Sequence, residues 1–399
     1  MSGAPPLYTR EFAFACGLHL AGAMSLAFFP LFPLFVKSIG GTETTIGLVL
    51  GIGAAASVAA RPGVGVLLDR IGRRRVLLGG NLLNAASWVP FLFVSSPGPW
   101  LYVWVTLHDV IWGALFAAYF TYAADLVPPA RRAEGIAVFG VAGMTANGLA
   151  PVLGEVVIAR AGFPAYFGTA IVFGLVSVAM TFPVVDRPMT RAGTTSGVLQ
   201  GLVALGRSPH LRRVFIASAF LGAAINAAFF FVAPFAHEIG LARAGPYFTA
   251  YAGTSIVIRL WGRRALDLMG PHRVSVPGFT IFAVGLAGLA LLPYVSGGMA
   301  TAVLVATGIA GGAGHGSLFP VLSALAITRA PLAMQGTVVS LHTAALDLGA
   351  VLGTPLCGAI ADAAGYPTMY VVMGICCWAG LILMVTDPVR EPAGHGRGR

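Results

Sequence analysis

The chain has 399 residues, of which 57% are hydrophobic and only 10% are charged, and its mean hydropathy is +0.85. These values exclude an ordinary water-soluble protein of this length and indicate a polytopic membrane protein. The formal net charge of +10 is explained by basic residues beside the membrane ends, so we expect no nucleic-acid partner.

Apolar runs of about 20 residues or more, long enough to cross a hydrocarbon core of ~30 Å, recur along the whole chain. These runs are too long and too uniformly apolar for the strands of a membrane barrel, so they predict an all-α protein. We expect twelve transmembrane helices, at 11–36, 43–68, 75–95, 99–124, 134–159, 164–185, 213–237, 244–268, 272–293, 299–327, 334–361 and 366–386.

Basic residues are concentrated on one side of this alternating map. Of the 24 Lys and Arg residues, only Lys37, Arg160 and Arg243 fall in loops on the other side. Because Lys and Arg near membrane ends are retained in the cytoplasm, both termini are expected to be cytoplasmic.

The second half of the chain repeats features of the first half. Residues recur 198 positions further on in five cases: Arg61, Asp69, Gly72, Arg75 and Val76 match Arg259, Asp267, Gly270, Arg273 and Val274. Further matches at nearly the same offset are Ile39-Gly40 with Ile239-Gly240, and Gly162 and Pro164 with Gly365 and Pro367. We therefore divide the chain into an N-terminal six-helix bundle (1–185), a cytoplasmic central loop (186–212), a C-terminal six-helix bundle (213–386) and a cytoplasmic tail (387–399). A parallel repeat of this kind places a substrate site between the halves, near the middle of the membrane.

Two loop motifs carry a resemblance to a known family. The first joins the second and third spans and contains Gly65, Asp69, Arg70, Gly72, Arg73 and Arg74. The second joins the fourth and fifth spans and contains Asp125, Pro128, Arg131, Arg132 and Gly135. With these motifs the chain resembles, over essentially its full length, a major facilitator superfamily transporter of the bacterial efflux type, similar to drug:proton antiporters. The resemblance implies two pseudo-symmetric six-helix bundles in the bacterial cytoplasmic membrane.

The resemblance also implies a gating role for the loop motifs, which we assign to Gly65, Asp69, Arg70, Gly72, Arg73, Arg74, Asp125 and Arg132. Asp69 at the membrane edge needs a partner, because a lone buried carboxylate is costly. Arg131, Arg132 and the N-terminal end of the eleventh helix near Gln335 are the candidates. The implied role is a latch on the cytoplasmic side in the outward-open state; a purely topogenic basic loop is the alternative.

Ionisable groups inside the spans are expensive and indicate function by default. His108 and Asp109 in the fourth helix are the first candidates for proton coupling, because adjacent residues point about 100° apart and at least one should face the cavity. A carboxylate that binds either a proton or a cationic substrate would give antiport by competition. A hydrogen-bonded packing role is the alternative for His108. Asp347, near the middle of the eleventh helix, is a second proton-site candidate or a partner of a neighbouring helix.

By resemblance, helices 1, 4, 7 and 10 line the central cavity, and the substrate-contact candidates on them are His19, Trp112, Asn226 and His315. Packing inside a bundle is the alternative for His19, Trp112 and His315. The fifth helix carries a degraded antiporter-like pattern at Asn147, Gly148, Pro151 and Gly154, in which Glu155 replaces a glycine. Small residues and a proline permit close packing and a local kink.

The sequence contains no phosphate-binding Gly-rich loop with Lys, no metal-spaced cluster and no Ser-His-Asp arrangement in a soluble domain, so we expect no enzyme, no cofactor and no metal site. The expected function is export of a small organic compound, a drug or metabolite, by proton antiport through alternating access. We expect a monomer whose partners are the small-molecule substrate, protons and the lipid bilayer. The alternatives are a proton-coupled uptake symporter for a sugar, organic acid or similar solute, and a non-transporting membrane sensor or scaffold.

Overall fold

The computed structural model describes the chain except for residues 1–6, 129–130, 186–207, 262–268, 331–334 and 388–399. Every regular element of the described part is a helix. The α-helices are α1 (Arg10–Leu26), α2 (Phe32–Ser38), α3 (Glu43–Ile71), α4 (Arg73–Ser87), α5 (Pro99–Leu126), α6 (Arg132–Thr181), α8 (Pro209–Phe230), α9 (Val232–Glu238), α10 (Gly245–Trp261), α12 (Pro271–Leu289), α13 (Gly297–Thr328) and α14 (Gln335–Val385). Short 3₁₀ helices are η1 (Phe29–Leu31), η2 (Val89–Leu92) and η4 (Leu292–Tyr294).

Several helices begin at residues whose side chains bond the exposed backbone N–H groups of the first turn. Thr9 accepts from the N–H of Phe12 at the start of α1, and Ser208 accepts from that of Leu211 at the start of α8. Thr42 forms a reciprocal capping box at the start of α3. These local signals set where the membrane helices start.

Glycines that the sequence repeat pairs between the halves also share a backbone conformation. Positive φ angles occur at Gly40 and Gly240, at Gly72 and Gly270, and at Gly162 and Gly365. Residues with a side chain rarely adopt this conformation, so glycine is needed at these turns. The repeat therefore extends from the sequence to the turns that end and restart helices.

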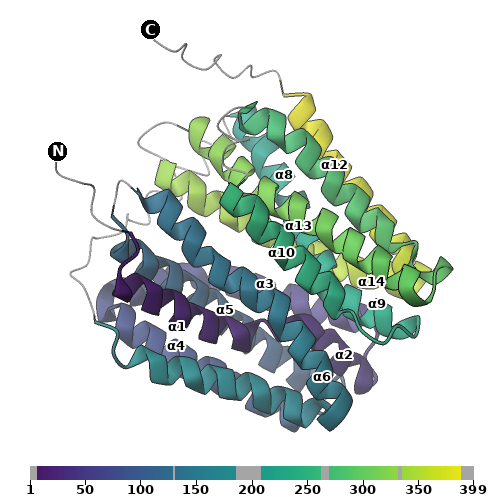
Figure 1. Cartoon of the computed structure of the whole chain (residues 1–399), viewed down its shortest axis with the longest axis horizontal. Coiled ribbons are helices and arrows are strands. Elements are labelled where there is room, and N and C mark those ends of the chain that lie inside the picture. The colour runs from purple at the N-terminus through teal and green to yellow at the C-terminus, as the bar shows by residue number, and fades with distance from the viewer. Residues whose placement is uncertain (1–6, 129–130, 186–207, 262–268, 331–334, 388–399) are drawn as a thin grey trace.

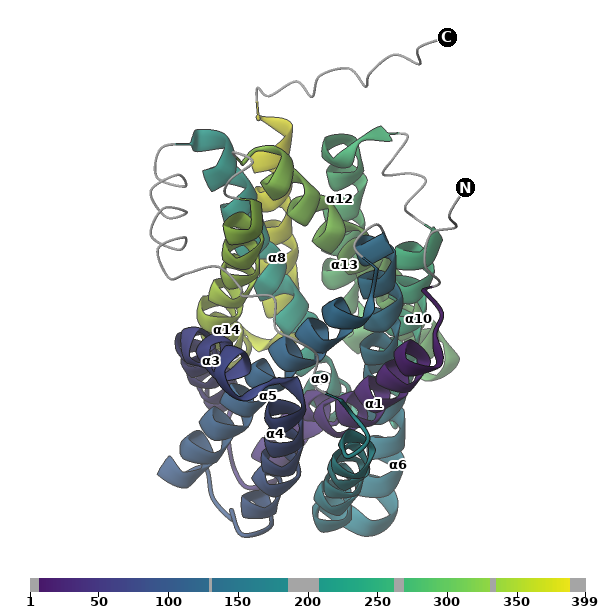
Figure 2. The ribbon, with the colours of Figure 1, turned by 90° about the vertical axis from the view of Figure 1, so that its left-hand side faces the viewer.

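The helices form two groups, one from each half of the chain (Figures 1 and 2). In the first group, α1 and α4 pack on α6, and α3 and α4 pack on α5. In the second, α8 and α12 pack on α14, and α10 and α12 pack on α13. The predicted central loop and tail lie almost wholly outside the described residues, so the domain boundaries of the sequence analysis stay a prediction.

Eight described stretches are long and apolar enough to cross a membrane, and the protein is a multi-pass membrane protein. Two of them, Glu134–Thr181 and Leu341–Val385, contain a break at Gly162 or Gly365 where the backbone leaves the helical region. Helices α4 and α10, with 15 and 17 residues, are not among the eight. The number of twelve crossings therefore stays a prediction, although the twelve predicted spans fall on the observed helices.

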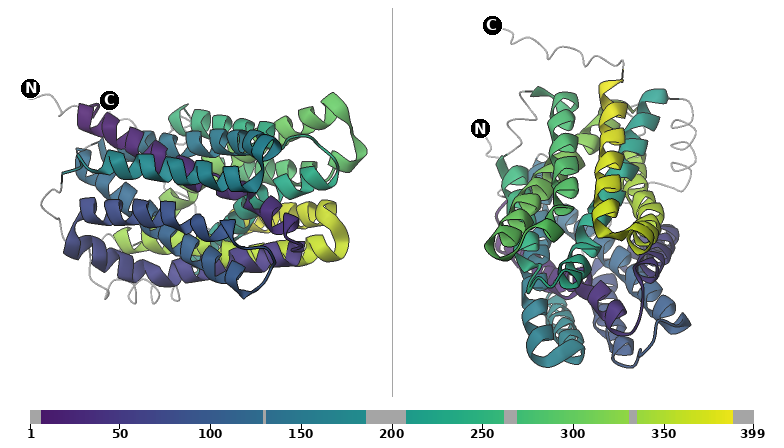
Figure 3. Two further views of the ribbon diagram at one scale, coloured as in Figure 1. Left: turned by 90° about the horizontal axis from the view of Figure 1, so that it is seen from below. Right: turned by 90° about the vertical axis from the view of Figure 1, so that its right-hand side faces the viewer.

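The two halves meet along two helix pairs, α3 with α14 and α6 with α10. They also meet where α2 contacts α9, on the right in Figure 1 and facing the viewer in the right-hand view of Figure 3; we call this the α2/α9 end. Glycines bring α3 and α14 together, since a Cβ at Gly47 or Gly358 would collide with backbone of the other helix. These contacts bear on the functional site, because groups that lie between the halves change partners when the halves move.

Candidate functional site

The carboxylate of Asp109 lies in α5 against Gly53 of α3. A Cβ at Gly53 would collide with the Asp109 side chain, so the glycine keeps the space that the carboxylate occupies. No hydrogen bond or ion pair joins Asp109 to any residue of the described part, and its side chain is half-buried. A carboxylate without a cationic partner in a membrane helix is a group that can take up a proton.

His108, next to Asp109, has a different environment inside the first half. Its side chain is 1% exposed and stacks on Phe29, with ring centroids 4.5 Å apart, and lies 4.8 Å from the Trp88 ring. The Ser87 hydroxyl donates to the Asn84 carbonyl, so His108 Nδ1–H donates to Ser87 Oγ at 2.9 Å. These are the contacts of a packed, hydrogen-bonded histidine, the alternative reading of this residue.

Asp347 forms an ion pair with Arg61, and the pair joins α14 of the second half to α3 of the first. The two side chains are 25% and 33% exposed. Of the two readings of Asp347, the structure thus places it with a neighbouring helix, and that helix belongs to the other half. Arg61 was noted in the sequence only as a repeated position, and the repeat gave no sign of its partner.

The four substrate-contact candidates do not share one environment. His19 is buried in the first half, where it stacks on Phe139 at 4.4 Å and its Nδ1–H donates to the Phe139 carbonyl at 3.2 Å. Asn226 donates to the carbonyl of Gly222 in its own helix. Trp112 is 46% exposed and lies one turn from Asp109. His315 is placed between Tyr251 and Arg259, two residues of α10.

The described part of the gating motif ties helices of the first half together. Gly72, with φ of 88°, separates α3 from α4. Arg73 is buried and donates through Nε to Asp125 at 2.8 Å and through Nη1 to the Leu68 carbonyl at 3.2 Å. Arg74 donates to the Phe182 carbonyl at 3.0 Å. The motif's cations therefore join the start of α4 to the ends of α5 and α6.

The rest of the motif leaves the proposed latch untested. Arg70 and Arg132 are exposed. The surroundings of Gly65 and the side chains of Asp69 and Gln335 lie outside what the structure describes. Arg131, one of the expected partners of Asp69, bonds Glu134 through two contacts of 2.9 and 2.7 Å.

The antiporter-like stretch of α6 faces α10. Gly148 permits this approach, since a Cβ there would come within 2.9 Å of Ala252, and its carbonyl accepts from Thr249 at 3.2 Å. Pro151 lies inside α6, Gly154 packs against Leu31 and Tyr166, and Asn147 is half-buried. The carboxylate of Glu155 accepts from the N–H groups of Ala244 and Gly245 at 2.6 and 2.9 Å, across the two halves. The departure from the family pattern at Glu155 thus supplies a contact at the α2/α9 end.

Other contacts close the α2/α9 end, and the sequence analysis did not select their residues. Thr44 donates to Asp362 at 2.7 Å, and the Tyr366 hydroxyl donates to Glu43 at 3.2 Å. Lys37 pairs with the same Glu43 carboxylate at 2.5 Å. Charges near helix ends look like ordinary solvated residues in a sequence, and only the fold shows that Glu43 and Asp362 bond residues of the other half.

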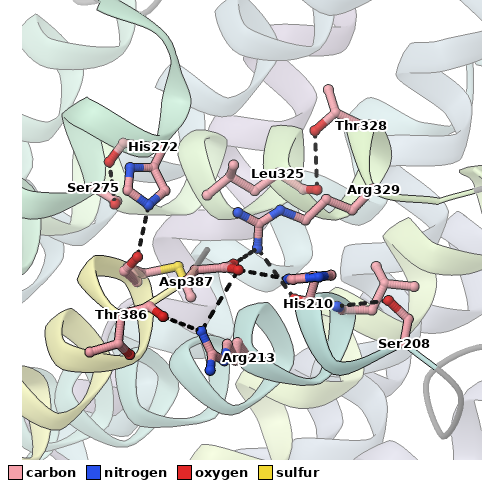
Figure 4. Close-up of polar contacts among 12 residues, drawn as sticks. Ser208, His210, Arg213, His272, Ser275, Leu325, Thr328, Arg329, Thr386 and Asp387 are labelled. Carbon is pink, nitrogen blue, oxygen red and sulfur yellow. Dashed lines mark hydrogen bonds and ion pairs between the residues drawn. The ribbon is translucent and has the colours of Figure 1, made fainter. Parts of the chain in front are cut away.

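A buried carboxylate organises the other end of the second half. Asp387 is paired with His210 at 2.7 Å, Arg329 at 2.5 Å and Arg213 at 3.8 Å, which joins the beginning of α8 to the ends of α13 and α14 (Figure 4). The Asp387 side chain is fully buried, although its position was assigned to the tail. In the described residues, no three His, Cys, Asp or Glu side chains are arranged to hold a metal ion.

Comparison with known proteins decides the family. A model of the Major Facilitator Superfamily matches residues 14–311 and 236–398. The chain belongs to this superfamily. It is 22% identical to the staphylopine export protein of Staphylococcus aureus (strain Mu50 / ATCC 700699) over 375 residues, which is 90% of each chain. It is 25% identical to an uncharacterised transporter of this type from Burkholderia pseudomallei (strain 1106a), over 97% of this chain and 96% of the relative.

Solved structures give the same fold. The nucleoside transporter NupG superposes with a TM-score of 0.77 at 13% identity, over 95% of this chain and 100% of the other. The protein is therefore a membrane transporter of the superfamily and not an enzyme. Transporters of this superfamily bind small-molecule substrates.

Proposed function

We propose that this transporter exports a small organic compound in exchange for protons, by alternating access, and that Asp109 carries the proton. The observation that supports this most is the Asp109 carboxylate in α5, next to Gly53 and without a described partner. Protonation and a cationic group of the cargo would compete for this carboxylate, and competition for one site couples the two fluxes. The export function of the 22% identical staphylococcal relative favours efflux over uptake.

The proposal includes the arrangement of the chain. Twelve helices cross the bacterial cytoplasmic membrane as bundles of 1–185 and 213–386, both termini lie in the cytoplasm, and the transporter works as a monomer. The α2/α9 end then faces away from the cytoplasm. The concentration of basic residues in the loops of the opposite end supports this orientation.

The test uses acid-loaded inverted vesicles that contain a pH probe and the wild-type protein. Vesicles are screened with cationic, zwitterionic and anionic drugs and metabolites, and proton efflux on addition of a compound identifies antiport. For the compound found, Asp109→Asn should abolish the proton signal. Substrate exchange at equal concentrations, which needs no net proton movement, should persist but require more substrate, because the variant lacks the carboxylate that binds the cationic group. Asp109→Glu should retain part of the signal.

His108→Gln is the matched comparison, because glutamine can still bond Ser87. We expect this variant to keep coupled transport. An equal proton signal in wild type and Asp109→Asn would remove Asp109 from the coupling. Accumulation of the compound with protons, in the opposite direction, would identify an uptake symporter instead.

A further inference from the structure

Arg259 is a cation inside the second half for which the described residues offer no counter-charge. Its guanidinium donates to His315 Nε2 at 3.5 Å and lies 5.7 Å from the centre of the Phe319 ring. Its Nε is buried and has no hydrogen-bond partner. The ion pairs of the described part involve other cations, such as Arg61 and Arg73, and none involves Arg259.

The internal repeat supplies a control for this observation. Arg61 occupies the matching position of the first half, and it is paired with Asp347 across the interface. When Gly162 is aligned with Gly365, Asp347 corresponds to Met144 of α6. Arg259 faces the same helix, since a Cβ at Gly140 would lie 3.8 Å from its Nη1. The α3/α14 contact between the halves therefore holds a neutralised pair. The equivalent α6/α10 contact holds Arg259 without a matching acid among the described residues.

An unpaired charge in a membrane helix is costly, so it is kept where a ligand or a partner complements it. A guanidinium presents planar N–H donors that match the two oxygens of a carboxylate. His315 holds Arg259 in place, and Tyr251 in turn holds His315. His315 accepts from the guanidinium through Nε2, so its Nδ1–H donates to the Tyr251 hydroxyl oxygen at 3.0 Å.

We propose that Arg259, positioned by His315 and Tyr251, binds a carboxylate group of the transported compound between α10 and α6. This inference rests on the proposed function and narrows it to a cargo that carries a carboxylate. As the halves move, the α6 side of this site changes, so the anion is held more tightly in one state than in the other.

Binding can be tested without a proton gradient. The thermal unfolding midpoint of the purified protein in detergent is measured with acetate, succinate, citrate and glutamate, each compared with its uncharged amide at equal ionic strength, and with inorganic phosphate. We expect at least one carboxylate to raise the wild-type midpoint by several degrees while its amide does not. The shift should disappear in Arg259→Gln and shrink in Arg259→Lys, which keeps the charge but loses the planar fork.

Arg61→Gln is the matched control, because it removes the equivalent arginine of the other half; its carboxylate shift should persist. The proposal is wrong if no carboxylate shifts the midpoint, or if Arg259→Gln responds as the wild type does. A larger Arg259-dependent shift with phosphate than with any carboxylate overturns the assignment to carboxylates. Should Arg259→Gln fail to fold, the carboxylate-induced shift of the unfolding midpoint is compared between Arg259→Lys and the wild type. A smaller shift in Arg259→Lys supports the proposal, and an equal shift contradicts it.

The same assay separates this inference from the proposed function. Carboxylate binding that depends on Arg259, in a protein that shows no proton antiport, would contradict the export proposal alone. Proton antiport of compounds that lack a carboxylate, with full activity in Arg259→Gln, would contradict the carboxylate site alone.

Discussion

Asp109 keeps its place in the membrane because Gly53 has no side chain. Glycine at this point of α3 does more than permit close packing, since the nearest atoms to a Cβ there belong to the Asp109 carboxylate and not to its backbone. The position of the acid is thus set by a residue that carries no chemistry of its own. A change at Gly53 tests that position without removing the acid.

We expect Gly53→Ala to lower the rate of coupled transport roughly tenfold, which corresponds to about 1.4 kcal/mol, because the carboxylate must move away from α3. The measurement is the initial proton flux in the vesicle assay, together with the amount of folded protein. Gly79→Ala is the control, since nothing lies within 4 Å of a Cβ at Gly79. Equal fluxes in wild type and Gly53→Ala would show that the carboxylate works from another place.

Histidines show what a sequence can and cannot predict at this scale. The sequence singled out His19, His108 and His315 because they lie in apolar helices, and it weighed a packing role for each. The structure gives His19 and His108 stacked aromatic neighbours within the first half. It places His315 beside a cation. All three are histidines in apolar helices, and only the neighbouring helices decide the role of each.

At the scale of elements, α3 and α14 form an interface that the sequence described only in pieces. The spans, the Gly-rich faces and the repeat were predictable, because each depends on local pattern. The pairing of Arg61 with Asp347 was not, because the two residues are 286 positions apart in the chain and belong to different halves. The sequence interpretation therefore left Asp347 without a partner and treated Arg61 as a repeat position.

A double-mutant cycle tests this pair. We expect Arg61→Gln or Asp347→Asn alone to lower the free energy of unfolding by about 2 kcal/mol, since each leaves one charge uncompensated. This is less than the ~3–5 kcal/mol of a fully buried pair, because the side chains are partly exposed. The double variant should lose less than the sum of the two. Additive losses in chemical unfolding would mean that the two side chains do not interact in the folded protein.

At the scale of the whole molecule, the contacts at the α2/α9 end include three carboxylates that each accept hydrogen bonds from the other half of the chain. Glu155 accepts from the N–H groups of Ala244, just before α10, and of Gly245, its first residue, where the positive end of the helix dipole favours a carboxylate. Asp362 accepts from Thr44, and Glu43 accepts from Tyr366. Each acceptor or donor belongs to a different half from its partner. Alternating access requires that these contacts break together when this end opens.

Removing the charges of two acceptors should therefore favour opening. We expect Glu155→Gln combined with Asp362→Asn to increase the population open at the α2/α9 end roughly tenfold, because hydrogen bonds to charged groups contribute about 1.5–3 kcal/mol each when buried and less when exposed. Spin labels at the exposed positions Ser38 on α2 and His237 on α9 report this by pulsed electron resonance. The wild type should give mainly short distances and the double variant a larger long-distance fraction. Glu134→Gln is the control, because Glu134 pairs with Arg131 of the same half. If this control shifted the distance distribution as far as the double variant does, opening would depend on a general loss of negative charge and not on the contacts between the halves.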